Sequence, residues 1–265
     1  METENNNNPH RNVFLIVLIS IIALFLVYYS IMSMLSPSRK LEEIKSEFGA
    51  KSSEKGKAEQ QILMDSEYLK VLKEKSFLQS RIAMAETDSI YMTINLSDSS
   101  ANLEISGVVV HNAKMSYMKT SKILMASNEN AILSKLAKPF SIDYALATIQ
   151  KEPVMIKMAP KDTSEYKPDI MPDTSIAEPV NYILETNQGI RIYVYQEETV
   201  KFKDRISRFK FDLNDRLRDT WSALKKVAVF KVPEYHPFIK IRLPRTDAKI
   251  IYRGIPKNGQ IALYY

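Results

Sequence analysis

The chain is organised around Val13–Leu35, which reads VFLIVLISIIALFLVYYSIMSML and contains no charge, no proline and no glycine. A helix needs about 20 apolar residues to cross the hydrocarbon core of a bilayer, so this stretch is long enough. The apolar run is longer than the roughly 7–15 residues of a signal-peptide core, and no small-x-small cleavage pattern follows at Ser36–Lys40. We therefore expect a retained single transmembrane helix, with the bilayer contacting the protein through Val13–Leu35.

The charges that flank this span and the size of the region beyond it predict opposite orientations. Before the span the basic residue is Arg11, offset by Glu2 and Glu4, whereas after it follow Arg39, Lys40, Lys45, Lys51, Lys55 and Lys57. A positive-inside count places the large domain in the cytoplasm, although long domains are translocated regardless of charge. A short polar tail, one span and a large distal domain is the usual plan of outward-facing envelope proteins. We expect the inner cell membrane, with the domain outside the cytoplasm.

Composition and patterning divide the remaining chain into a stalk and one domain. The chain has 265 residues and a net charge of +6, and it contains no cysteine, which excludes disulfides, thiolate zinc sites and a cysteine nucleophile. The expected class is α+β. The expected parts are a disordered polar tail over 1–12, the span over 13–35, a helical or coiled-coil stalk over 36–86 and a globular domain over 87–265. Pro37 is expected to break the helix or let it restart.

The stalk contains a heptad pattern whose a and d positions form a seam. Its members are Met64, Tyr68, Val71, Lys75, Leu78 and Ile82. One interpretation is a stalk that forms a homodimer through this seam. The other is an amphipathic helix packed on its own domain, because about three heptads with one lysine pair weakly.

Alternating apolar residues and turn signals predict a domain rich in antiparallel β-hairpins. The expected strand pairs are Ile90–Leu96 with Leu103–Val110, Val180–Glu185 with Ile190–Tyr195, and Ile250–Arg253 with Ile261–Tyr265. The last pair is joined by a turn that contains Asn258-Gly259, a strong hairpin signal.

Residues 199–231 have helical spacing and predict one long amphipathic helix. Its apolar stripe consists of Phe202, Ile206, Phe209, Leu213, Leu217 and Leu224, and the other face is strongly basic. One interpretation packs the stripe on the core and leaves the charges in solvent. The other gives the basic face an anionic partner, such as lipid headgroups or cell-wall polymer. The candidate contact residues are Arg205, Arg208, Arg216, Arg218, Lys225 and Lys226. Nucleic acid is the weaker choice, because the phenylalanines are needed for the stripe and no base-stacking motif is present.

We find no constellation in the sequence that predicts catalysis, a metal site or a cofactor. The three histidines are far apart, and of these only His111, at the end of an apolar strand, is a plausible site residue. The spacing of a histidine or cysteine metal site is missing, as are a P-loop, G-x-G-x-x-G and G-x-S-x-G. We therefore expect neither an enzyme nor a cofactor.

The strand pair Ile90–Val110 and the segment Ala159–Thr163 are similar to the start of L,D-transpeptidase domains, which act on peptidoglycan. That family has a catalytic His-Gly motif followed by Ser-His-Gly-Cys. This chain has no cysteine and no His-Gly, so the resemblance implies an inactive relative and assigns no catalytic residue.

Together these features predict a membrane-anchored envelope protein with a non-catalytic scaffold or assembly role. Its distal α+β domain is expected to contact other envelope proteins or the cell wall. The alternatives are an inactive cell-wall enzyme relative and a membrane-anchored cytoplasmic adaptor.

Overall fold

The computed structural model describes residues 9–49, 66–126, 137–151, 178–198 and 202–264. Met64 of the expected seam and Ala159–Thr163 of the transpeptidase resemblance lie outside these residues. The chain forms two compact units, which are described separately below. The first contains Met1–Ser46 and Asn214–Tyr235, and the second contains Glu47–Leu213 and His236–Tyr265.

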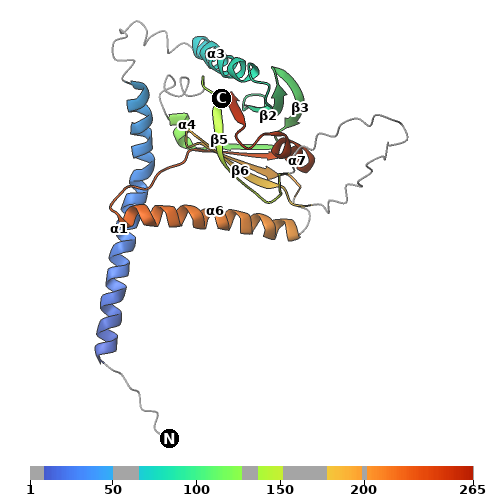
Figure 1. The fold of residues 1–265 in the computed structure, drawn as a ribbon. Coiled ribbons are helices and arrows are strands. Elements are labelled where there is room, and N and C mark those ends of the chain that lie inside the picture. The colour runs from blue at the N-terminus through green and yellow to red at the C-terminus, as the bar shows by residue number, and fades with distance from the viewer. Residues whose placement is uncertain (1–8, 50–65, 127–136, 152–177, 199–201, 265) are drawn as a thin grey trace. The chain divides into compact units, whose positions relative to one another are not determined.

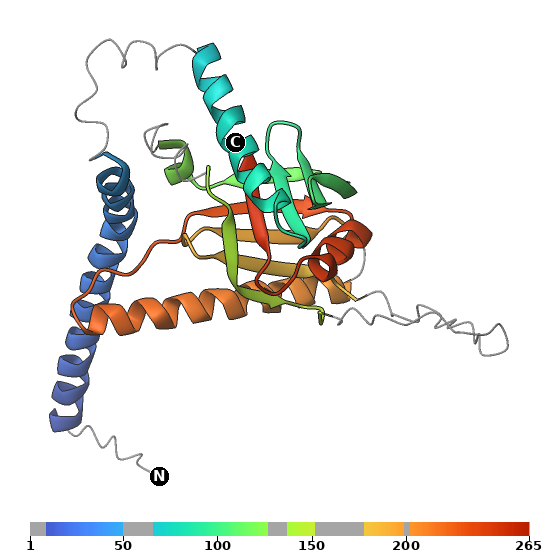
Figure 2. The ribbon, with the colours of Figure 1, turned by 45° about the horizontal axis from the view of Figure 1, so that its top comes forward.

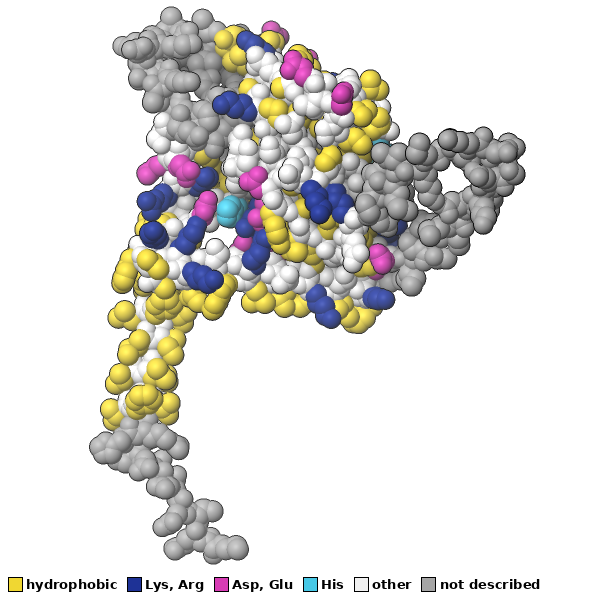
Figure 3. Space-filling model, in the orientation of Figure 1, with side chains coloured by type: hydrophobic (Ala, Val, Ile, Leu, Met, Phe, Trp, Pro, Cys, Tyr) yellow, Lys and Arg dark blue, Asp and Glu magenta, His cyan; other side chains and the backbone are white. Residues whose placement is uncertain are grey.

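Helix α1 (Pro9–Gly49) belongs mainly to the first unit and contains the expected span. It is long and apolar enough to cross a membrane, and none of its most apolar window is buried, unlike the core helix of a soluble protein (Figure 3). Pro37 lies inside the helix, which does not break there but continues to Gly49. The apolar run and the charged segment after it therefore form one helix.

A nine-stranded mixed sheet builds the second unit (Figure 1). The strands are β1 (Tyr91–Asn95), β2 (Ser100–Ile105), β3 (Val108–Lys114), β4 (Tyr117–Thr120), β5 (Phe140–Ala147), β6 (Asn181–Thr186), β7 (Arg191–Gln196), β8 (Phe238–Leu243) and β9 (Gln260–Tyr264). Their order is β3-β2-β1-β9-β5-β6-β7-β8-β4. Most neighbouring strands pair antiparallel, but β1 pairs with β9 and β7 with β8 in parallel, which the expectation of antiparallel hairpins did not include. Parallel neighbours need a long connection, which for β7 and β8 contains helix α6 (Phe202–Ala228).

Among the described residues, the helices α3 (Ser66–Ala85), α4 (Lys122–Ala126) and α7 (Arg245–Gly254) also belong to this unit. Helix α7 occupies the place where the sequence predicted the strand Ile250–Arg253, so that prediction was wrong. Its buried residues are Ala248, Ile251 and Tyr252, which recur at the i, i+3, i+4 spacing of one helix face. The short apolar run resembled a strand, but its burial follows the helical period.

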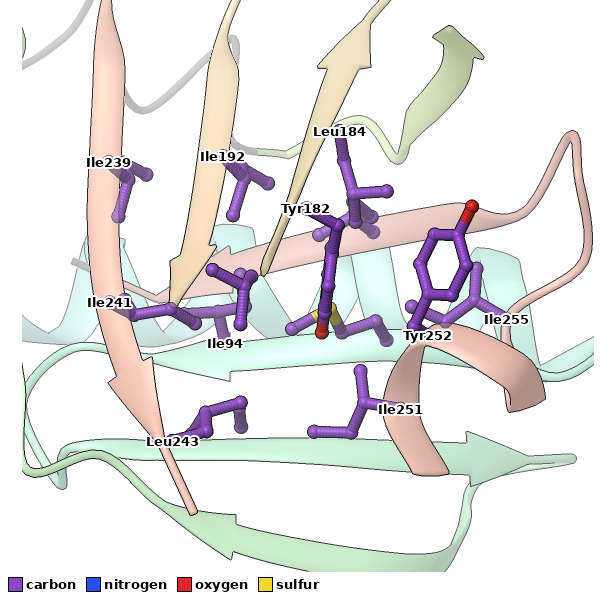
Figure 4. Close-up of a cluster of buried hydrophobic side chains, with 14 of the residues drawn as sticks. Ile94, Tyr182, Leu184, Ile192, Ile239, Ile241, Leu243, Ile251, Tyr252 and Ile255 are labelled. Carbon is purple, nitrogen blue, oxygen red and sulfur yellow. The ribbon is translucent and has the colours of Figure 1, made fainter. Parts of the chain in front are cut away.

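The two faces of the sheet pack against different partners. On one face Ile192 of β7 and Ile241 of β8 join the main core, to which α7 contributes Ile251 (Figure 4). On the other face Tyr193 and Tyr195 form a smaller cluster with Phe211 of α6 and Ile183 of β6. Alternate residues of β7 therefore point into two separate apolar layers, and every residue of that strand is buried.

Helix α3 packs against β9 at one side of the sheet (Figure 2). Met84 is buried with Tyr91 and Ala262, and the rings of Phe77 and Tyr264 lie 5.4 Å apart. A charged contact reinforces this packing, because Arg81 Nε donates a 2.6 Å hydrogen bond to the buried carboxylate of Glu104 on β2. Helix α3 is therefore part of the sheet domain.

Candidate functional site

An apolar stripe on α6 remains exposed from Phe202 to Trp221, whereas Leu224, the last member of the expected stripe, is half-buried. Phe202 is 78% exposed, Phe209 66% and Trp221 60%. The same stripe includes Ile206, Leu213 and Leu217, which are also exposed. Figure 3 shows hydrophobic side chains gathered along α6. Full burial of a large apolar side chain contributes about 1.5–3 kcal/mol, so this stripe would gain substantially from an apolar environment.

None of the four acidic residues of α6 lies on the exposed stripe. Asp204 and Asp215 are buried, whereas Asp212 and Asp219 are half-buried. Asp204 accepts a 3.2 Å hydrogen bond from Arg245 of α7, and Asp212 accepts one of 2.9 Å from the hydroxyl of Tyr195. The inward contacts of α6 therefore combine Phe211 with hydrogen-bonded carboxylates.

The prediction that the apolar stripe packs on the core was wrong. The outer face of β7 presents Tyr193 and Tyr195, which pack on Phe211 of α6, and the Tyr195 hydroxyl also needs a hydrogen-bond acceptor. Asp212 supplies that acceptor, and the guanidinium of Arg208 lies 4.3 Å from the centre of the Tyr195 ring. Polar complementarity with these tyrosines thus orients the helix and leaves its stripe outside.

Helix α6 ends in a Schellman motif with an unusual residue at its left-handed position. The Lys231 N–H donates to the carbonyl of Lys226, the Phe230 N–H donates to the carbonyl of Val227, and both bonds are 2.9 Å long. Phe230 has φ of 57°, a conformation that glycine adopts readily and that costs other residues about 1–2 kcal/mol. Its side chain is also 81% exposed. Strain of this kind often marks a functional position.

Phe230 and its neighbours contact α1 within the first unit. The rings of Phe230 and Tyr28 meet edge to face with 5.8 Å between their centroids. Further along α1, the buried Ser36 hydroxyl donates a 2.7 Å hydrogen bond to the carbonyl of Pro233. The C-terminal end of α6 is therefore held beside the last turns of the apolar part of α1.

A hollow of about 510 Å³ lies where the charged part of α1 meets the segment after α6. Its charged lining residues are Arg39, Lys40, Glu43, Lys226, Lys231 and Glu234. Two pairs neutralise part of this charge: Lys40 bonds Glu43 at 3.0 Å, and Lys226 bonds Glu234 at 2.6 Å. Four cations against two carboxylates leave the lining net positive just beyond the apolar run.

The basic residues predicted to contact an anionic partner have different environments. Arg218 bonds the buried Asp215 at 3.0 Å, and Arg208 and Lys226 are engaged as described above. Arg205 and Arg216 are exposed on one flank of the apolar stripe. Lys225 is exposed on the other flank, with its ammonium group 5.5 Å from the centre of the Trp221 ring. These cations can be identified from the sequence. The exposure of the apolar stripe between them depends on tertiary packing and cannot.

The expected seam of α3 also lies on the outer surface. Tyr68, Val71, Leu78 and Ile82 are exposed, as is Lys75, while Ser76, Ser80 and Met84 face the domain. Helix α3 therefore packs on its own domain, as one of the two interpretations expected, but through the face opposite the seam. The exposed row is available to a second copy or to another protein.

His111, the histidine singled out in the sequence, pairs with Asp247 of α7 across 3.2 Å. Both side chains are about one quarter exposed, and the pair connects β3 to α7. Within the described ranges no group of three or more His, Cys, Asp or Glu residues is arranged to hold a metal ion. The pair thus has a clear structural role.

The strands β1 and β2 occupy the region for which the sequence suggested a likeness to L,D-transpeptidases. Comparison with protein-family models, curated proteins and solved structures finds no match for this chain.

Proposed function

We propose that this chain is a single-pass membrane protein of the cell envelope that acts as a non-catalytic scaffold or assembly subunit. Its anchor is α1, and its α+β domain stands outside the cytoplasm and contacts other proteins. The observation that carries the proposal is the apolar row that α3 displays outward while its other face is fixed to β9. A domain that holds such a row in one place presents a preformed surface to a partner.

The contacts of α1 support a retained anchor. A signal peptide is removed and makes no lasting contacts, whereas Tyr28 and Ser36 contact Phe230 and Pro233. These four residues join the apolar helix to the segment that follows α6. Cleavage after the apolar run would remove a part of the folded unit.

The edge strand β3 supports a role in protein contact. It pairs with β2 on one side and is the first strand of the sheet order. Val108, Val109 and Val110 are all exposed on it. An exposed apolar edge strand is a template for pairing with another chain, and soluble proteins usually protect such edges with charge or proline.

The seam of α3 can be tested by single-cysteine crosslinking, because the native chain contains no cysteine. We expect Leu78→Cys to give a disulfide-linked dimer of the full-length protein in native membranes. Ala83→Cys is the matched control, since Ala83 is also exposed but lies about 100° around the helix from the seam. A purely monomeric Leu78→Cys protein, or equal crosslinking at both positions, would overturn the homodimer.

Orientation requires a separate experiment. A reporter that is active only outside the cytoplasm, fused after Tyr265, should be active in cells. Activity of a cytoplasm-specific reporter at the same position would instead favour the membrane-anchored adaptor.

A further inference from the structure

We propose that α6 is an in-plane membrane helix whose exposed stripe lies in the acyl-chain and headgroup boundary of the leaflet where the apolar part of α1 ends. The occupant of this surface is the lipid bilayer itself. The inference goes beyond the scaffold role and rests only on the part of the proposed function that makes α1 a retained anchor. It follows from the exposure, charge pattern and contacts of α6.

The length of the stripe requires the helix to lie flat. Exposed apolar side chains recur from Phe202 to Trp221, over most of a helix of 27 residues. A helix of that length is about 40 Å long. Such a stripe can enter an apolar medium along its whole length only when the helix axis is parallel to the surface of that medium.

The distribution of charge favours lipid over a second protein surface. The exposed cations Arg205 and Arg216 flank the stripe on one side, and Lys203, Lys210 and Lys225 flank it on the other. All four aspartates are buried or half-buried. Long basic side chains beside an apolar stripe extend their charges to headgroup level, and anionic lipids attract them. Exposed carboxylates beside the stripe would be repelled, and none of the four aspartates of the helix is exposed.

The contact between Phe230 and Tyr28 gives the expected depth. Tyr28 precedes the last residue of the apolar run, Leu35, by seven positions, or about 10 Å along the helix axis. Interfacial helices bury their apolar faces about 5–10 Å into the headgroup and acyl boundary. Phe230, at the end of α6, therefore lies at the depth expected for such a helix. The strained conformation of Phe230 places an exposed aromatic ring at this point.

The single tryptophan of the chain, Trp221, lies on the stripe and reports directly on its environment. The experiment uses the full-length protein reconstituted into vesicles of phosphatidylcholine and phosphatidylglycerol. Lipids with brominated acyl chains quench a tryptophan that is in the membrane, and acrylamide quenches one in water. We expect strong quenching of Trp221 by brominated lipid, weak quenching by acrylamide and blue-shifted emission.

A pair of variants tests whether the stripe is responsible. Leu217→Asp places a carboxylate beside Trp221 and is expected to reduce bromolipid quenching and increase acrylamide quenching. Ser222→Asp adds the same charge at an exposed position on the far side of the helix and should leave both unchanged. Because α1 still anchors both variants, a change in quenching reports α6 alone.

Two outcomes would overturn the inference, and the wild-type protein suffices to reveal either. Efficient acrylamide quenching without bromolipid quenching places Trp221 in water. Protection from both quenchers places it in a protein contact, such as with a second copy. Resistance of the protein to alkaline carbonate extraction tests the α1 anchor independently, so failure of the anchor is distinguishable from failure of α6 to enter the bilayer.

Discussion

The aromatic rings of Tyr28 and Phe230 meet edge to face, 5.8 Å apart, although more than 200 positions separate them in the chain. Tyr28 lies in the apolar part of α1, and Phe230 follows the last turn of α6. Phe230 adopts the left-handed conformation that usually selects glycine. A large exposed ring in this strained conformation is expected if the contact made by the ring is itself needed.

Phe230→Gly is therefore expected to have opposite effects on the helix and on the membrane contact. Glycine removes the backbone strain, which should slow hydrogen exchange at the end of α6 by about fivefold, equivalent to about 1 kcal/mol. Loss of the ring should at the same time reduce bromolipid quenching of Trp221. Phe230→Leu keeps an apolar side chain and should preserve the quenching. Unchanged quenching in the glycine variant would contradict an anchoring role for the ring.

The flanking cations make a second prediction about α6. Arg205→Glu combined with Arg216→Glu should reduce the membrane burial of Trp221 in anionic vesicles and leave it nearly unchanged in neutral ones. A basic residue near an anionic membrane contributes about 1 kcal/mol, and salt screens this attraction. The control, Lys119→Glu with Lys257→Glu, changes the net charge equally at exposed positions on the sheet domain. Equal effects of the two double variants would mean that only overall charge matters.

The sequence predicts the individual helices and strands of this protein better than it predicts which of them pair or pack together. Val13–Leu35 is recognisable because length and apolarity are local properties, and the alternation in Arg191–Gln196 reflects the two apolar layers that cover β7. The parallel pairing of β1 with β9 joins residues at opposite ends of the domain, and no local pattern encodes it. Helix α7 was missed because a short apolar run fits either period.

The environment of α6, like the pairing of β1 with β9, could not be predicted from local sequence. Helical spacing identifies Phe202, Phe209 and Leu217 as one stripe, but an apolar stripe has the same pattern whether it faces a sheet or a bilayer. The hydrogen bond between Asp212 of α6 and Tyr195 of β7 helps to determine which face of the helix turns toward the sheet. The contacts between α6 and β7 fix the rotation of the helix, and this rotation determines which residues of α6 are exposed.

The ion pair between Arg81 and Glu104 should determine how firmly α3 is held on the sheet. Glu104 is buried and also accepts a 2.7 Å hydrogen bond from the hydroxyl of Thr93. Arg81→Met leaves this carboxylate without its cation and should lower the free energy of unfolding by about 2–3 kcal/mol, less than for a fully buried pair because Arg81 is 31% exposed. Urea titration of the detergent-solubilised protein measures the loss. Adding Glu104→Gln should restore much of it, and no recovery would show that Arg81 acts through packing alone.

Tyr195 makes a prediction about alkaline pH. Burial, followed by the carboxylate of Asp212, raises the pKa of the Tyr195 hydroxyl far above its ordinary value of 10.0. The folded state therefore favours the protonated phenol, and this contribution is fully present below pH 10 and decreases as the pH rises further, because the unfolded chain then releases the proton. Tyr195→Phe loses the hydrogen bond and should be about 1–2 kcal/mol less stable at pH 8. Between pH 10 and pH 11 the difference in the free energy of unfolding between the wild type and this variant, measured by urea titration, should become smaller. A constant difference across that range would show that the pKa of Tyr195 is not raised in the folded state, whereas narrowing would confirm that the folded state keeps this phenol protonated.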